Sequence, residues 1–255
     1  MQPSPWAVER HATVGSTMDV AKERARAGAA DGTVVVAEEM TGGRGSHGRP
    51  WAAPKGGLYL SIVLRGLKDP HLLTLALGNA VADALEVAGV EPRLKWVNDV
   101  HLAPSPGDAK ADSKGLGKKV AGILVEGEST GASFDFLVAG IGVNVNGKAS
   151  DLKGLEKTAT TLEEQLGCDS CIPDLEALLL HNVAGWLEKV RGGRDAEVVA
   201  AFRARDGLAG KTVRVADGGK VVEGLADGVD DRGHLRVKGK TGVQTVSTGT
   251  VQVVG

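Results

Sequence analysis

The stretch VVVAEEMTGGRGSHGRPW, residues 34–51, joins a run of valines to a loop of glycines and cations. Three successive β-branched residues are typical of a buried strand, which would fix one end of the loop. The four glycines within residues 42–48 let backbone N–H groups approach an anion, and Arg44 and Arg49 supply positive charge. The stretch therefore predicts a strand followed by a loop that binds a phosphate or a carboxylate, covered by the ring of Trp51.

The glycine spacing at residues 43–48 also matches, in form, the dinucleotide-binding fingerprint Gly-x-Gly-x-x-Gly. That motif requires a helix directly after the glycines, and Pro50 and Pro54 disfavour a helix there. We therefore exclude a dinucleotide-binding fold. A solvated basic turn is the alternative interpretation, and the loop alone does not decide against it.

Composition limits the classes of protein that this chain can belong to. Its 255 residues can bury a full core. A formal charge of −2 argues against a dedicated DNA-binding protein, which would usually present a strongly basic face. No apolar stretch is long enough to span a bilayer, and residues 1–10 lack the apolar core of a signal peptide. A cytoplasmic protein without a membrane partner is expected.

The two cysteines, Cys168 and Cys171, form a single C-x-x-C pair. A zinc site would need a second pair or a nearby histidine, and neither follows. A redox motif would need a helix directly after it, and Pro173 and Asp174 argue against that helix. We interpret the pair as two reduced thiols at a helix start.

Ser16 and Asp19 have the spacing of a capping box, which predicts a helix from residue 16 to about residue 27. Ser16 and Thr17 would then lie at a helix N-terminus, where backbone N–H groups can hold a polar ligand. Capping alone also explains Ser16, so this position does not by itself indicate a binding site.

Residues 94–100 read as a strand in which Lys95, Asn98 and Asp99 interrupt an apolar pattern. These groups are costly to bury unless they pair with one another or with a ligand. They indicate a ligand site, and a strand end held by a salt bridge is the alternative.

The rest of the chain alternates apolar strands with amphipathic helices up to residue 207 and contains only short alternating strands beyond it. Further strands are expected at 58–64, 120–126 and 134–145, helices at 72–88, 174–190 and 196–204, a long mobile loop at 103–118, and terminal strands at 212–215, 221–226, 234–238 and 243–246. Gly140 and Gly142 inside a strand indicate that another group approaches the backbone closely. The terminal strands predict a small SH3-like β-barrel, which divides the chain into residues 1–207 and 208–255.

Several of these stretches occur together in the order and spacing of a biotin protein ligase. The chain resembles that family at Gly15-Ser16-Thr17, Gly43-Arg44-Gly45-x-x-Gly48-Arg49-x-Trp51, Lys95-Trp96-x-Asn98-Asp99, Lys119-Val120-Ala121-Gly122-Ile123-Leu124-Val125-Glu126 and Gly140-Ile141-Gly142-Val143-Asn144-Val145-Asn146. Without an N-terminal helix-turn-helix it is similar to the short class that lacks a DNA-binding domain.

The resemblance implies an α+β fold, in which helices flank a mixed β-sheet, followed by the SH3-like barrel. It also implies a two-step reaction with ATP and Mg²⁺. The biotin carboxylate attacks the α-phosphate to give biotinyl-5′-adenylate and pyrophosphate, and a lysine of the acceptor then attacks the mixed anhydride. The implied acceptor is the biotin carboxyl carrier protein domain of a biotin-dependent carboxylase, and a homodimer through sheet edges is compatible with the family.

The resemblance also implies a role for each site residue. The biotin site would comprise Ser16, Thr17, Met40, Arg44, Gly45, Lys119 and Gly122, the nucleotide site Ser46, Arg49, Trp51, Asn98 and Asn144, and the catalytic set Arg44, Lys95, Asp99 and Lys119. Cations suit this reaction because a carboxylate must approach a triphosphate. Asp99 is the candidate for orienting the acceptor amine, and the metal ligands stay unassigned.

Four positions depart from the family pattern: Met18 in place of Asn, Met40 in place of Gln, Ser46 in place of Arg and Val97 in place of Pro. The two methionines remove amides near the biotin pocket and so remove hydrogen bonds to the ureido ring or reshape the pocket. Two alternatives therefore stay open. One is a ligase of the same fold for lipoate or a fatty acid, and the other is a catalytically weak paralogue that binds biotin or its adenylate.

Overall fold

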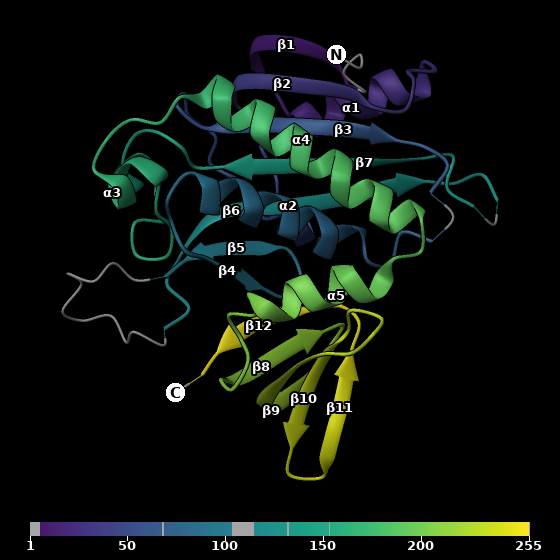
Figure 1. Ribbon diagram of the computed structural model, residues 1–255, viewed down its shortest axis with the longest axis vertical. Coiled ribbons are helices and arrows are strands. Elements are labelled where there is room, and N and C mark those ends of the chain that lie inside the picture. Colours follow the sequence, from purple (N-terminus) through teal and green to yellow (C-terminus); the bar gives the residue numbers. More distant parts are fainter. Residues whose placement is uncertain (1–5, 68, 104–114, 132, 153, 255) are drawn as a thin grey trace.

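The computed structural model describes residues 6–67, 69–103, 115–131, 133–152 and 154–254 (Figure 1). Within these ranges the chain forms a seven-stranded sheet and a five-stranded sheet. In Figure 1 the smaller sheet lies below helix α5 (Asp195–Ala204), at the opposite end from the N-terminus. The residues after 207 thus form the separate antiparallel sheet that their alternating pattern predicts.

The large sheet is mixed, as expected. Its strands are β1 (Ala7–Val14), β2 (Thr33–Met40), β3 (Leu58–Leu64), β4 (Pro92–Lys95), β5 (Asp99–Leu102), β6 (Lys118–Glu128) and β7 (Phe136–Val143), in the order β1-β2-β3-β7-β6-β5-β4. β1 and β2 are parallel, because helix α1 (Thr17–Arg26) carries the chain back between them, and the other neighbours are antiparallel.

Helices cover both faces of this sheet. The remaining ones are α2 (Leu73–Val87), α3 (Leu162–Leu166) and α4 (Ile172–Arg191), and short 3₁₀ turns occur at Ser46–Gly48 and Ala149–Leu152. Val34 and Val36 belong to the large core shared with α2 and α4, whereas Val35 belongs to a smaller core under α1. This alternation is the period of two that a strand buried on both faces requires, so the prediction from the three valines is confirmed.

The prediction of one strand over residues 94–100 was wrong. β4 ends at Lys95, β5 begins at Asp99, and the two strands pair antiparallel with Lys95 directly opposite Asp99. Trp96 and Val97 continue the apolar pattern and so read as part of one strand, but together with Asn98 they form the turn of a hairpin. Residues 104–114, which make up most of the predicted mobile loop, lie outside the described residues.

The small sheet consists of β8 (Thr212–Asp217), β9 (Lys220–Val229), β10 (Leu235–Gly239), β11 (Gly242–Val246) and β12 (Thr250–Val253), in the order β11-β10-β9-β8-β12. The sequence pattern did not predict β12, which pairs with β8. Val213 and Val237 are fully buried and belong to the large core, so one face of this sheet packs into that core. The indole N–H of Trp96 donates to the carbonyl of Gly233 at 2.8 Å and connects the two sheets.

The two cysteines are free and exposed at the start of α4, as predicted. The argument against a following helix was wrong, because α4 begins at Ile172 with Pro173 in its first turn. Proline is tolerated there since its missing N–H would have no partner within the helix. Across the described ranges, no helix combines the length and the apolar character needed to cross a membrane.

Candidate functional site

A cavity of about 330 Å³ lies between the glycine loop, the N-terminus of α1 and strands β5, β6 and β7. This is a volume typical of small-molecule sites. All of the predicted site residues line it: Ser16, Thr17, Met40, Arg44, Gly45, Ser46, Arg49, Trp51, Lys95, Asn98, Asp99, Lys119, Gly122 and Asn144. The fold therefore brings together stretches that are more than a hundred residues apart in sequence.

The glycine loop is a compact hairpin that carries Trp51 over the cavity. Arg44 and Pro50 form an antiparallel bridge, and the Trp51 N–H donates to the Gly43 carbonyl at 2.9 Å. A Cβ atom at Gly142 would lie 2.8 Å from the Trp51 indole, so a larger residue could not occupy that strand position. The close approach predicted from the strand glycines is, at Gly142, the packing of this indole.

The capping box predicted at α1 does not form. Ser16 is the N-cap residue and is buried, but its side chain makes no capping hydrogen bond. The Asp19 carboxylate accepts instead from the Arg44 guanidinium, with 2.6 Å between Nη1 and Oδ2. Asp19 pairs with the Arg44 guanidinium and not with a backbone N–H, because two charge-assisted hydrogen bonds are stronger than one bond to an amide.

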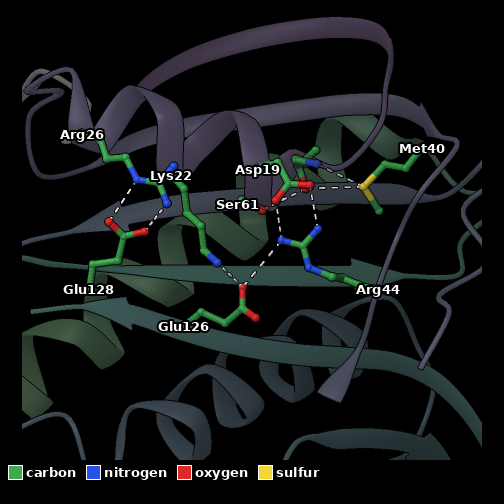
Figure 2. Close-up of polar contacts among 9 residues, drawn as sticks. Asp19, Lys22, Arg26, Met40, Arg44, Ser61, Glu126 and Glu128 are labelled. Atoms are coloured by element: carbon green, nitrogen blue, oxygen red, sulfur yellow. Dashed lines mark hydrogen bonds and ion pairs between the residues drawn. The ribbon is translucent and has the colours of Figure 1, made fainter. Parts of the chain in front are cut away.

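Arg44 is held in a network of charges between α1 and β6 (Figure 2). Both of its terminal nitrogens donate to Asp19, and Nη2 lies 3.8 Å from the Glu126 carboxylate, which also pairs with Lys22 at 2.7 Å. The hydrogen bond from Arg44 lowers the pKa of Asp19, and the same bond raises the pKa of Arg44. The cation of the loop thus already has a carboxylate partner at the edge of the cavity.

The Met40 sulfur, labelled in Figure 2, accepts hydrogen bonds from Thr17 in the adjoining part of the cavity wall. The N–H and the hydroxyl of Thr17 lie 3.3 and 3.5 Å from Sδ of Met40, and the Thr17 hydroxyl accepts from Ser61 at 2.8 Å. Met18 packs so closely against Gly140 that a Cβ atom there would lie 2.6 Å from the Met18 sulfur. Both unexpected methionines therefore shape the cavity, and one of them occupies donors that a ligand would otherwise use.

The opposite wall holds two lysines that share one carboxylate. Asp99 lies 2.5 Å from the Lys119 ammonium and 3.7 Å from the Lys95 ammonium. Burial lowers the pKa of Lys95. Burial also opposes ionisation of Asp99, but the charge and the hydrogen bond of Lys119, together with the charge of Lys95, keep the pKa of that carboxyl below its usual range. The excess positive charge in a poorly hydrated place favours the entry of an anion.

The two predicted amide ligands have partners within the protein. Asn98 donates to Ser46 Oγ at 2.9 Å and to the Ile123 carbonyl at 2.8 Å. Asn144 is buried and donates to the Thr160 carbonyl at 3.1 Å. Asn98 therefore connects the glycine loop to the sheet, across the cavity from the Arg44–Asp19 pair.

Sequence reasoning missed two parts of the cavity wall. Leu152, Leu155, Thr158 and Ala159 line it, and the Lys119 N–H donates to the Thr158 carbonyl at 2.9 Å. This segment has no apolar period that could have marked it. His101 also lines the cavity, and its position two residues after Asp99 on a strand was the available signal.

His101 is neutral in the folded protein. Burial lowers its pKa to about 4, Nδ1 donates to the Gly117 carbonyl at 3.0 Å, and Nε2 has no hydrogen-bond partner among the described residues. With respect to metals, the described ranges contain no cluster of three or more histidine, cysteine, aspartate or glutamate side chains able to hold an ion.

The sequence and the fold match known proteins over nearly the whole chain. Residues 11–144 match the biotin/lipoate A/B protein ligase family, and residues 209–254 match the biotin protein ligase C-terminal domain. The biotin–acetyl-CoA-carboxylase ligase of Mycobacterium tuberculosis is 35% identical over 256 residues, which cover 94% of this chain and 86% of that protein. The bifunctional ligase/repressor BirA of Bacillus subtilis is 34% identical over 163 residues, and that match spans only 46% of its length.

Among solved structures, a biotin protein ligase from Aquifex aeolicus in complex with biotin and ATP has the same fold. The two chains superpose with a TM-score of 0.83 and 26% identity, and the match covers 97% of this chain and 99% of that one. Shared architecture therefore extends through both sheets.

Proposed function

The chain belongs to the biotin/lipoate A/B protein ligase family, and from this premise we propose that it is an ATP-dependent biotin protein ligase. It forms biotinyl-5′-adenylate and pyrophosphate from biotin and ATP, and it then transfers biotin to a lysine of a carrier protein. The observation that carries this proposal is that one cavity is lined by all of the site residues that the resemblance implies.

In the first step the cavity must bring a carboxylate against a triphosphate. Lys119 and Lys95, with one carboxylate between them, offer excess positive charge on one wall, and Arg44 and Arg49 project from the loop on the other. These groups stabilise the charge that builds up as the carboxylate oxygen bonds to the α-phosphorus and pyrophosphate leaves. Trp51, Ser46, Asn98 and Asn144 then hold the adenylate, and Ser16, Thr17, Met40, Gly45 and Gly122 surround the biotin end.

In the second step a neutral acceptor amine attacks the carbonyl carbon of the anhydride and AMP leaves. Deprotonating a lysine of ordinary pKa costs about 4–5 kcal/mol at neutral pH. Burial opposes ionisation of Asp99, but the charge and the hydrogen bond of Lys119 and the charge of Lys95 together lower its pKa, so the carboxyl is ionised at neutral pH. Its proposed role is to orient the amine by accepting a hydrogen bond, while it also holds Lys119 in place.

Magnesium enters as part of the ATP substrate in this proposal. Asp99 is the one carboxylate among the residues that line the cavity, and Mg²⁺ is commonly bound by one or two carboxylates together with substrate phosphates. The acid and the phosphates would thus hold the ion together.

The proposed acceptor is the carrier domain of a biotin-dependent carboxylase, since the M. tuberculosis relative is named as a ligase for acetyl-CoA carboxylase. The proposed compartment is the cytoplasm, which suits two exposed free thiols. We further propose that the domain boundary lies between residues 207 and 208, ahead of β8, and that the chain forms a homodimer through sheet edges.

Pyrophosphate release in the presence of MgATP and single acids tests the function. Biotin should support release, and lipoate and octanoate should not. Release with lipoate or octanoate alone would favour the related acid ligase, a result for which the capture of the Thr17 donors by Met40 provides a physical reason. Tight biotin binding without release for any acid would favour the binding paralogue. Biotin transfer to a purified carrier domain then tests the second step.

A further inference from the structure

Asp19 has no role in the reaction above, yet its carboxylate holds the arginine of the glycine loop. We propose that Asp19 is a positioning residue, which acts through Arg44 to fix the loop and the Trp51 indole over the cavity while the adenylate is bound. This inference rests on the proposed adenylate chemistry and assigns to it a residue outside the stretches in which the chain resembles the family.

Asp19 lies on a helix that is fixed to the large sheet. It occupies the first turn of α1, whose buried residues Ala21 and Ala25 pack in the core beneath the helix. The same helix is joined to β6 by Lys22, 2.7 Å from Glu126, and by Arg26, which donates to Glu128 at 3.0 Å (Figure 2). A group anchored to Asp19 is therefore anchored to the large sheet.

The position of Arg44 is coupled to that of Trp51 through the hydrogen bonds of the loop. Arg44 and Pro50 face each other across the hairpin, the Gly45 N–H donates to the Arg49 carbonyl at 2.8 Å, and the Trp51 N–H donates to Gly43. The two strands of the loop thus move together. Displacing Arg44 would displace the indole that covers the cavity.

Within the described part of the chain, the tip of the loop is attached to the rest of the protein through few side chains. Among the described residues, the side chains of residues 43–50 contact the rest of the protein by hydrogen bonds or ion pairs at Arg44 and at Ser46. Ser46 meets Asn98 on the β5 side, and Arg44 meets Asp19 on the α1 side. Losing the Asp19 contact would leave the tip attached on one side of the cavity.

Arg44 keeps N–H donors that Asp19 does not use. A guanidinium has five N–H donors, and Asp19 takes one from each terminal nitrogen. The remaining donors are held in a fixed plane for a ligand. The Asp19 side chain is 58% exposed, so the pair contributes little to folding, and its main consequence is the orientation of the loop.

The test compares Asp19→Asn with the unaltered chain. Dissociation of biotinyl-adenylate should become about three- to tenfold faster, the KM for ATP should rise, and kcat for pyrophosphate release should change less than about twofold. Asp19→Glu, which keeps the charge, should restore slow dissociation. The matched control is Glu23→Gln on the same helix, because Glu23 pairs only with Arg24, at 3.8 Å, in the described structure.

A double-mutant cycle separates positioning from a general effect on the fold. In an Arg44→Lys background, which lacks the fork, Asp19→Asn should produce no further acceleration. An equal acceleration in both backgrounds, or dissociation at the original rate in the single variant, would overturn the inference while leaving the ligase assignment intact.

Hydrogen exchange provides a readout that requires no activity. The N–H groups of Gly45 and Trp51, both hydrogen-bonded inside the loop, should exchange faster in Asp19→Asn than in Glu23→Gln at equal global stability. Failure of the unaltered chain to form an adenylate with any acid would reject the proposed function. Unchanged hydrogen exchange at Gly45 and Trp51 in Asp19→Asn would reject the positioning role of Asp19, whatever the outcome for the function.

Discussion

Two aspartates each hold a cation of the cavity wall, Asp99 from within that wall and Asp19 from outside it. Asp99 holds Lys119 and lies near Lys95 on the β4–β5 hairpin, with 18% of its side chain exposed, whereas the Asp19 side chain on α1 is 58% exposed. Water therefore screens the Asp19–Arg44 pair strongly and the more buried Asp99–Lys119 pair only weakly. The same kind of ion pair therefore serves two purposes, a permanent charged wall on the hairpin side and an adjustable contact on the loop side.

The largest expected effect separates these two carboxylates by stability. Asp99→Asn leaves two lysine charges close together without a counter-charge, and breaking a buried pair in this way should cost about 3 kcal/mol of unfolding free energy. Asp19→Asn should cost no more than about 1 kcal/mol, because its partner remains hydrated. Urea unfolding of both variants at neutral pH measures the difference. Equal losses would show that burial does not distinguish the two sides.

A second prediction concerns activity on the hairpin side. Lys119→Ala should lower kcat/KM for pyrophosphate release about 10- to 150-fold, which is the loss of one charged hydrogen bond of about 1.5–3 kcal/mol in the activated complex. Folding should suffer less, since Lys95 remains near Asp99. The neighbouring Lys118→Ala is the control, because Lys118 is exposed and donates to the Glu156 carbonyl. Unchanged release by a folded Lys119→Ala protein would remove Lys119 from the mechanism.

A third prediction uses the pH dependence of the same wall. Burial lowers the pKa of His101 from 6.5 to about 4, so between these values the unfolded chain binds a proton that the folded chain does not. The contribution of His101 to the unfolding free energy is therefore fully present above pH 6.5 and is lost as the pH falls toward 4. Between about pH 7.5 and about pH 5 the unfolding free energy should fall by about 2 kcal/mol more in the original chain than in His101→Leu. Parallel losses in both proteins would contradict the assignment.

The smallest effect is expected on the loop side, at Ser46. An arginine there would add a charged contact of about 1.5–3 kcal/mol to the adenylate, but it would lose the hydrogen bond from Asn98, worth about 1 kcal/mol. Ser46→Arg should therefore slow adenylate dissociation about two- to thirtyfold. With the original serine we also expect labelling of lysines on an unrelated protein. Equal dissociation rates and no such labelling would show that Ser46 does not weaken retention.

Local patterns were sufficient where one segment determines its own environment. The three valines, the strand at Leu58–Leu64 and the core helix near residues 72–88 lie where periodicity placed them, because side-chain burial follows the repeat of a strand or a helix. The β4–β5 hairpin was missed because its turn, residues 96–98, is short and contains the apolar Trp96 and Val97, which continue the pattern of a strand.

The sequence by itself determined the family and the motif residues of the cavity wall, because short motifs at characteristic spacings carry both. Only the tertiary structure decided which charge partners those residues have. Arg44 pairs with Asp19 across 25 positions of sequence, Lys119 pairs with Asp99 across 20, and the Met40 sulfur meets Thr17 across 23. Such pairs form through the packing of separate elements against one another, and no local repeat in the chain records which side chains that packing brings within hydrogen-bond distance.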